Sequence, residues 1–264
     1  MENVYDTLYV ICAATGALMA ALLLFYLTRK RPLDPVCVIF AYLSAFIGVF
    51  IGSHLLFFIV GLPSFGEKYA GMIHDVGTFI DAFLNASSGL VFYGGLYGAI
   101  IAVYLFCKAR NLNIRSYMNA AACAFPMFHG FGRIGCTLDG CCYGIEYHGI
   151  FAIQYTPAHV NPGISDNLAD FPRFPVQPLE AVLEFAICFM LVRLFIKTGD
   201  RYPLVPIYLF IYGVVRFFDE FLRGDAVRGL WGPFSTSQWI ALASIIGTLI
   251  YFITRRRAAR PEHA

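Results

Sequence analysis

Residues 36–60 read VCVIFAYLSAFIGVFIGSHLLFFIV, a run without aspartate, glutamate, lysine or arginine. A helix needs about 20 apolar residues to cross a bilayer. Only 14% of the whole chain is charged, against roughly 25% in a typical soluble domain. The run and the composition together predict an integral membrane protein.

Similar apolar windows recur along the chain. We place them at 8–28, 89–107, 116–131, 178–197, 204–222 and 236–254. The window at 116–131 is short and is broken by Pro126 and Gly130. Because a helix satisfies its own backbone hydrogen bonds in lipid, helices are the expected elements. The sequence predicts an all-α, polytopic integral membrane protein with about seven transmembrane helices, built as a single transmembrane domain over residues 1–264.

Basic residues are divided unevenly between the two sets of connections that seven spans create. One set holds twelve: Arg29, Lys30, Arg31, Lys108, Arg110, Arg115, Lys197, Arg201, Arg255, Arg256, Arg257 and Arg260. The other set holds five: Lys68, Arg133, Arg173, Arg223 and Arg228. The positive-inside rule places the first set in the cytoplasm, so we expect the N-terminus outside and the C-terminus inside.

Two outward segments are long, about 61–88 and 132–177, and we expect them to form a small extracytoplasmic cap. The first is expected to hold a short helix on the membrane, and the second has a weak strand signal at 150–155. No basic start of a cleavable signal peptide precedes the first span, which is therefore expected to be retained. No basic run is interleaved with aromatic residues, so nucleic acid is not an expected partner.

The stretch His129–Gly144, HGFGRIGCTLDGCCYG, differs from the rest of the chain. It holds five glycines, three cysteines, an arginine, an aspartate and a histidine. Glycine lets backbone approach a ligand closely, and arginine offers a planar fork of donors suited to phosphate or carboxylate. The glycines beside Arg133 suggest close packing around its side chain. We interpret the stretch as an anion-handling loop at the membrane surface.

A second polar group lies in the window 204–222. Tyr212, Arg216 and Glu220 are four residues apart and share one helix face. One interpretation is an ion pair within the helix that only neutralises two charges. The other is a substrate path, which intramembrane ionisable groups commonly mark. Because Arg133 and Arg216 come from separate segments near the outer leaflet, we predict that they bind one phosphate together.

Three further patterns have alternative explanations. Gly94 and Gly98 form a G-x-x-x-G face that is typical of tight helix packing. Glu180 either complements a helix dipole or orients an arginine from a neighbouring helix. The cysteines at 136, 141 and 142 are compatible with a disulfide, a reactive thiolate, a metal site of poor spacing, or plain burial. No metal and no cofactor is expected from the spacing alone.

Four blocks, in this order, resemble the bacterial prolipoprotein diacylglyceryl transferase family. They are Tyr93-Gly94-Gly95-Leu-x-Gly98, Gly132-Arg133-Ile-Gly135 with Gly140 and Gly144, Pro175-x-Gln177-x-x-Glu180, and Tyr212-Gly-x-x-Arg216-x-x-x-Glu220. Ser237-Gln238 at the start of the last window also fits, and the blocks span roughly residues 87–240.

The resemblance implies an enzyme of the bacterial cytoplasmic membrane with seven spans and an outward active site. Such enzymes move the diacylglyceryl group of phosphatidylglycerol to the thiol of a lipobox cysteine in a secreted preprolipoprotein, forming a thioether. Arg133 and Arg216 would then bind the phosphate, and Glu220 and Glu180 would position them. The implied substrate-binding set is Gly94, Gly95, Gly98, Gly132, Gly135, Cys136, Asp139, Gly140, Cys141, Gly144, Gln177, Glu180 and Tyr212.

The chain departs from the family's usual pattern at several positions. Tyr93 stands where the family has a histidine, and Cys136, Asp139 and Cys141 stand where it has two asparagines and a glutamate. His129 lies four residues before Arg133, so we expect it to be the replacement base, with Tyr93 as a hydrogen-bond donor. These departures leave two alternatives open: a related transferase that uses another acceptor, and a non-catalytic protein that binds or transports lipid.

Overall fold

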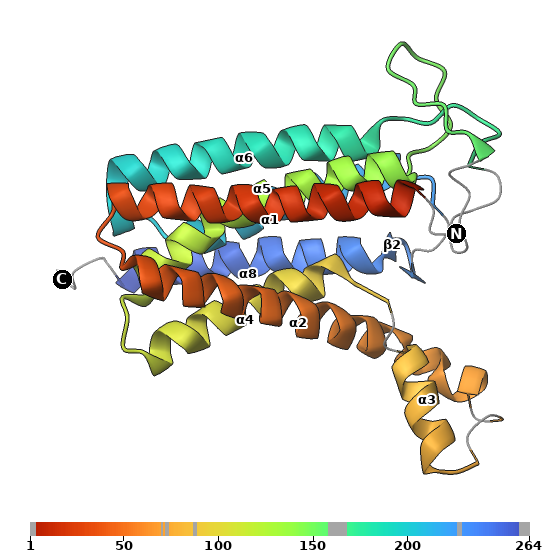
Figure 1. The fold of residues 1–264 in the computed structure, drawn as a ribbon, viewed down its shortest axis with the longest axis horizontal. Helices are drawn as coiled ribbons and strands as arrows, with labels where there is room; N and C mark the ends of the chain where they lie inside the picture. Colours follow the sequence, from red (N-terminus) through yellow and green to blue (C-terminus); the bar gives the residue numbers. More distant parts are fainter. Residues whose placement is uncertain are drawn as a thin grey trace. The chain divides into compact units, whose positions relative to one another are not determined.

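Helices dominate the described part of the chain, which in this computed structural model is residues 4–69, 71, 74–86, 89–157, 168–225 and 229–258. In chain order they are α1 (Val4–Lys30), α2 (Pro35–Tyr69), α3 (Val76–Ala86), α4 (Phe92–Ala109), α5 (Ile114–Asp139), α6 (Val176–Thr198), the 3₁₀ turn η2 (Gly199–Arg201), α7 (Leu204–Asp219), η3 (Glu220–Leu222) and α8 (Thr236–Ala258) (Figure 1). Strands β1 (Leu230–Trp231) and β2 (Phe234–Ser235) form a small antiparallel hairpin before α8. The predicted all-α class is confirmed.

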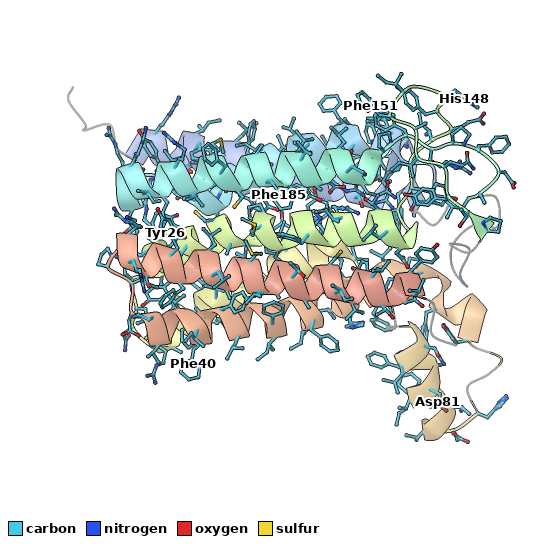
Figure 2. The ribbon with its side chains drawn as sticks, turned by 45° about the horizontal axis from the view of Figure 1, so that its top comes forward. Tyr26, Phe40, Asp81, His148, Phe151 and Phe185 are labelled. Carbon is cyan, nitrogen blue, oxygen red and sulfur yellow. The ribbon has the colours of Figure 1, made fainter. Side chains whose placement is uncertain are left out.

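Every predicted membrane window falls on a helix, and four stretches are long and apolar enough to cross a membrane. They are Val4–Lys30, Pro35–Pro63, Phe92–Ala109 and Thr236–Arg256, with mean hydropathies of 2.3, 2.3, 1.4 and 1.5. Large apolar side chains stand exposed on these helices, and Figure 2 shows one of them, Phe40, pointing outward from α2. The other three windows fall on α5, α6 and α7, which carry buried ionisable residues, and α7 is only 16 residues long. Seven spans therefore stay a prediction.

The chain divides into two compact units, residues 32–121 and residues 1–31 with 122–264. In the first of these, α2 and α4 approach so closely that only glycine fits between them. A Cβ on Gly52 would lie 2.2 Å from the Gly94 carbonyl oxygen, and one on Gly48 would lie 2.3 Å from that of Gly98. Glycine faces of this kind let helix backbones pack directly against each other.

The other unit contains α1, most of α5, and α6 to α8. Gly16 of α1 lies against α5, and Gly130 of α5 lies against Phe185 of α6. Gly213 of α7 lies against Ala241 and Ile245 of α8. Helices α6 and α7 also contact each other, so the polar residues of α5, α6 and α7 come together.

The chain after α5 is tied to the end of α7 by backbone hydrogen bonds. Ile145 N–H donates to the Leu222 carbonyl at 2.9 Å, and Gly224 N–H donates to the Tyr143 carbonyl at 2.9 Å. Next to these bonded segments in the chain, the buried side chains of Tyr143, Tyr155 and Leu168 form a small hydrophobic core. The region 158–167 of the predicted cap lies outside the described residues, as do Arg228 and Arg260 of the charge count.

Three local predictions need correction. Helix α5 continues through Pro126 and Gly130 to Asp139, so most of the predicted anion-handling loop is helical; Pro126 sits in a tightly buried segment, where packing offsets the lost backbone hydrogen bond. The strand signal at 150–155 yields one isolated bridge, Ile153 with Arg173, because no further residues continue the pairing. Helix α2 extends past its predicted end to Tyr69, and the predicted short helix that follows is present as α3.

Candidate active site

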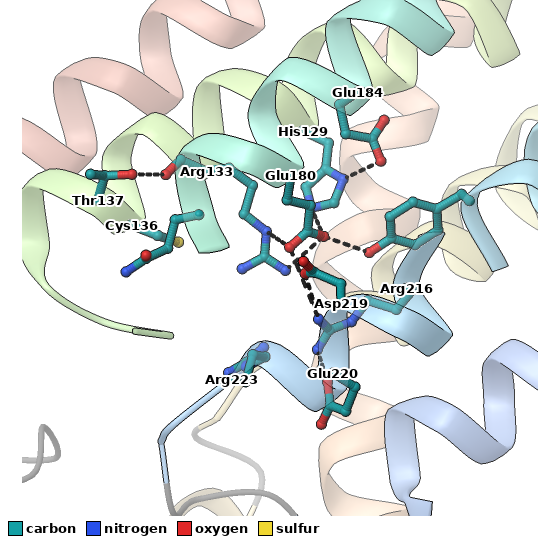
Figure 3. Close-up of polar contacts among 12 residues, drawn as sticks. His129, Arg133, Cys136, Thr137, Glu180, Glu184, Arg216, Asp219, Glu220 and Arg223 are labelled. Carbon is teal, nitrogen blue, oxygen red and sulfur yellow. Dashed lines mark hydrogen bonds and ion pairs between the residues drawn. The ribbon is translucent and has the colours of Figure 1, made fainter. Parts of the chain in front are cut away.

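Three helices each contribute polar residues four apart to one buried cluster. They are His129 and Arg133 on α5, Glu180 and Glu184 on α6, and Tyr208, Tyr212 and Arg216 on α7, with Asp219 and Glu220 at the end of α7. Figure 3 shows the charged members of this set and His129. Residues four apart lie on one helix face. Because the three polar faces meet each other, ionisable groups stay paired in an apolar surrounding, as buried charges require.

Glu180 is the centre of the cluster. The Arg133 guanidinium donates from Nη2 to Glu180 Oε1 at 3.0 Å, and its Nε lies 2.9 Å from Oε2, an ion-pair contact off the N–H direction. Tyr212 donates its hydroxyl to Oε1 at 3.0 Å. Arg216 Nη1 lies 4.0 Å from Oε2. Two guanidinium groups from different helices therefore reach the same carboxylate oxygen.

Arg216 has two more carboxylate partners on its own stretch of chain. Its Nη1 donates to Asp219 Oδ2 at 3.4 Å, and its Nη2 pairs with Glu220. The predicted Arg216–Glu220 pair is thus present, and Asp219 joins it. Arg216 is held from three sides, which fixes the direction in which its remaining donors point.

His129 is paired with the second carboxylate of α6. Its Nδ1 lies 2.9 Å from Glu184 Oε1, and its Nε2 lies 3.8 Å from Glu180 Oε1. Tyr208 donates to Glu184 over 3.4 Å. A carboxylate that accepts from one ring N–H orients the imidazole and leaves the other nitrogen as a hydrogen-bond acceptor. This arrangement suits a group that accepts a proton.

The cluster carries more carboxylates than guanidinium groups. Glu180, Glu184, Asp219 and Glu220 are four acids against two arginines, Arg133 and Arg216, and all six are buried. Glu180 occupies the Nε–Nη2 edge of Arg133, so the Nη1 edge faces away from this carboxylate. A Cβ on Gly132 would meet no heavy atom of the described residues within 4 Å. The predicted close packing is therefore absent at Gly132 among the described residues and present at Gly135, where a Cβ would lie 3.0 Å from Tyr9 and 3.2 Å from Cys12.

A turn rich in cysteine follows Arg133 along the chain. Cys136 is on the last turn of α5, and Gly140 and Cys142, with φ of 82° and 57°, reverse the chain behind it. Only glycine adopts that region readily, so the turn is strained at Cys142. Gln177 of α6 donates to the Cys141 carbonyl at 2.9 Å and to the Tyr155 hydroxyl at 3.1 Å. Its own amide oxygen is buried and has no hydrogen-bond partner among the described residues.

The Cys142 thiol has an unusual electrostatic setting. Hydrogen bonds with the Cys136 and Cys141 thiols lower its pKa well below the ordinary value, burial opposes them, and the guanidinium groups of Arg223 and Arg133 lower it further. The pKa of Cys141 is raised by the same hydrogen bonds and by burial. The three neighbouring thiols therefore differ in pKa, and that of Cys142 is the lowered one.

Comparison with known proteins decides the family. The profile of the family described as prolipoprotein diacylglyceryl transferase matches residues 6–254. The chain belongs to the prolipoprotein diacylglyceryl transferase family.

Several clostridial relatives are similar over much of the chain. A phosphatidylglycerol–prolipoprotein diacylglyceryl transferase of Clostridium tetani (strain Massachusetts / E88) is 31% identical over 245 residues, 92% of this chain and 91% of the relative. Clostridium perfringens (strain 13 / Type A) has two proteins of that name, numbered 1 and 2. Number 2 is 31% identical over 180 residues, 68% of each chain. Number 1 is 25% identical over 244 residues, 92% of this chain and 86% of the relative.

Within this transferase chain, the structure brings part of the predicted site together. His129, Arg133, Glu180, Tyr212, Arg216 and Glu220 form the cluster, and Gln177, Cys136, Gly140 and Cys141 form or hold the turn beside it. Gly144 packs its backbone against Phe174, and Asp139 ends α5. Tyr93, Gly94, Gly95 and Gly98 lie in the unit of residues 32–121, where helix packing accounts for Gly94 and Gly98. A substrate role for these four residues stays a prediction.

Sequence reasoning missed four members of this site: Glu184, Asp219, Tyr208 and Arg223. Glu184 follows Glu180 by four residues inside an apolar segment, and Tyr208 precedes Tyr212 by four. Because each lies four positions from a predicted site residue, helical spacing predicts that Glu184 and Tyr208 share the same helix faces. Asp219, three residues after Arg216, carries the same signal. Arg223 lies beyond the helix, so periodicity gives no such signal for it.

Proposed function

We propose that this chain transfers the diacylglyceryl group of phosphatidylglycerol to a cysteine thiol of a secreted preprolipoprotein. The observation that supports it most is the convergence of Arg133 and Arg216 on one carboxylate oxygen of Glu180. Side chains that reach one anionic oxygen from two helices are placed to bind one phosphate. Family membership supports the reaction, and the convergence of the two arginines supports a phosphate site beside them.

The reaction forms a bond between the acceptor sulfur and a glycerol carbon and breaks the bond from that carbon to a phosphate oxygen. The thiol loses its proton, and the electron pair of the broken bond leaves with glycerol phosphate. Arg133 and Arg216 stabilise the charge that grows on the leaving phosphate. His129, held by Glu184, accepts the thiol proton, while Glu180 and Glu220 keep the arginines in place. The Gln177 amide oxygen, which has no hydrogen-bond partner among the described residues, suits a polar group of the substrate.

The remaining features of the proposal concern the membrane. Seven helices cross the bacterial cytoplasmic membrane with the N-terminus outside and the C-terminus in the cytoplasm, and the segments around 61–88 and 132–177 form an outer cap on a single domain. This is supported by the excess of basic residues on one set of connections. Reporter fusions after residues 31 and 258 should both report the cytoplasm; two outside results would reverse the orientation, and one outside result would contradict the count of seven spans.

The activity is tested with purified protein, labelled phosphatidylglycerol and a lipobox peptide. Glycerol phosphate should be released only with the peptide, and the peptide should gain diacylglyceryl mass; a peptide with serine for the acceptor cysteine is the control. Arg133→Gln and Arg216→Gln should each lower the rate by about 100-fold or more. The exposed Arg201→Gln is the matched control and should leave it unchanged. Wild-type protein that binds the lipid without any turnover would contradict the proposal.

A related transferase with another acceptor is the second candidate. It is favoured by the chemistry of Tyr93, Cys136, Asp139 and Cys141, which differs from the pattern of the resembling family. In the same assay, this alternative predicts that lipobox peptides leave glycerol phosphate release unchanged while another thiol or hydroxyl compound stimulates it.

A further inference from the structure

The three cysteines near Arg133 meet in space although they are irregularly spaced in the sequence. The Sγ atoms of Cys136, Cys141 and Cys142 all lie within 4.8 Å of one another. The end of α5 brings the three sulfur atoms together. Gly140 N–H donates to the Cys136 carbonyl at 3.0 Å, and the chain then turns back through the positive φ of Cys142. None of the chain's eight cysteines is in a disulfide.

These sulfur positions fit a bound metal ion. Zinc binds cysteine sulfur at about 2.3 Å, so two thiolates on one tetrahedral zinc ion lie about 3.8 Å apart. The three thiols need to close by no more than about 1 Å to reach that geometry. Thiolate ligands select soft ions such as zinc over magnesium or calcium. The sequence spacing of the three cysteines gave no reason to expect a metal, because it does not show the turn at residues 140–142 that brings their sulfur atoms together.

The surrounding charges suit a site of three thiolates. Three thiolates and one zinc ion carry a net charge of minus one, and an arginine lies on each side of the cysteine turn: Arg133 three residues before Cys136 on α5, and Arg223 in a backbone bridge with Gly144. Arg223 is itself paired with Asp225. Cations on both sides of the turn lower the cost of a buried anion there, even though each of them also pairs with a carboxylate.

The three cysteine thiols also lie beside the site proposed for the reaction. Cys136 follows Arg133 by three residues on α5, so the thiols lie next to the proposed phosphate position. Among the described residues, no fourth histidine, cysteine, aspartate or glutamate joins the group. Three protein ligands with an open fourth position are the pattern of catalytic zinc, whereas structural zinc has four.

We propose that Cys136, Cys141 and Cys142 bind a zinc ion through their thiolates, and that the acceptor cysteine thiol takes the fourth position. This inference rests on the proposed function and states how its acceptor is activated. A coordinating thiol is deprotonated outright, because the cation favours the charged form. The acceptor sulfur then supplies the electron pair for the new carbon–sulfur bond, its proton goes to His129, and the pair of the broken carbon–oxygen bond leaves on glycerol phosphate.

The metal site is tested without reference to activity. Full-length protein, purified in detergent under reducing conditions, is reconstituted with zinc, desalted and analysed for metal by mass spectrometry. We expect about one zinc per chain, and the Co²⁺-substituted protein should show sulfur-to-cobalt charge-transfer absorption. Cys136→Ser, Cys141→Ser and Cys142→Ser should each weaken zinc binding by about tenfold or more, since even loss of an outer-shell partner costs that much. Cys37→Ser, in the other unit, is the matched control and should bind zinc as wild type does.

The acceptor step is tested on the Co²⁺ form. A lipobox peptide should change the absorption spectrum, and the same peptide with serine for cysteine should not. Wild-type protein with no bound metal, or with a disulfide between two of the three cysteines, would overturn the inference without using any variant. Chelator-treated, metal-free enzyme that keeps full transfer activity would overturn it while the proposed function stands. Zinc binding and the spectral change without any diacylglyceryl transfer would instead sink the proposed function and keep the site.

Discussion

Glu180→Gln is expected to be the most damaging single substitution in the cluster. Glu180 is the carboxylate that pairs with Arg133 within the described chain, through contacts of 2.9 and 3.0 Å, and it is 2% exposed. The glutamine keeps the shape of the side chain but removes its charge. A buried arginine left without its partner destabilises a protein by about 3–5 kcal/mol. Arg216 keeps Asp219 and Glu220, so the loss falls on Arg133.

Glu220→Gln is the matched control, because it removes a charge from the same cluster while Arg216 retains two carboxylates. We expect its loss of stability to be about 1.5–3 kcal/mol, the net value of a single hydrogen bond to a charged group. Thermal unfolding in detergent should rank the proteins as wild type, then Glu220→Gln, then Glu180→Gln. Transfer by folded Glu180→Gln should fall about 100-fold, because Arg133 is misplaced. Equal melting temperatures for the two variants, with normal transfer by Glu180→Gln, would refute Glu180 as the organising carboxylate.

The remaining predictions concern other parts of the two units. His129→Ala should lower transfer by about 100-fold or more while phosphatidylglycerol binding persists, since it removes a proton acceptor and not a phosphate contact; full activity would exclude it as the base. Tyr212→Phe should destabilise the protein by about 1.5–3 kcal/mol through loss of a short hydrogen bond to a carboxylate, and Tyr208→Phe by less because its bond is 3.4 Å long, as thermal unfolding would show. Gly52→Ala should cost about 1–3 kcal/mol of stability by overpacking, whereas Gly247→Ala, which meets no described atom within 4 Å, should be tolerated in the same melting assay.

Local spacing in the sequence anticipated much of the cluster. The Arg216–Glu220 pair and the shared face of His129 and Arg133 follow from residues four apart on helices. For Glu180 the sequence allowed two interpretations, and the structure shows the one in which it pairs with an arginine of a neighbouring helix. The strand near 150–155 was wrong because alternation alone does not supply a partner strand.

The sequence by itself determined that this is an all-α membrane protein, since runs of apolar residues leave the backbone no other way to satisfy its hydrogen bonds in lipid. It also determined which charged residues share a helix face, because the period of the helix is fixed by covalent geometry. Only the tertiary structure decided that Glu180 pairs with Arg133 and Glu184 with His129, and that three cysteines meet at the end of α5. Contacts between helices depend on how each is rotated and packed, and the turn at Cys142 depends on a backbone conformation that no periodic pattern encodes.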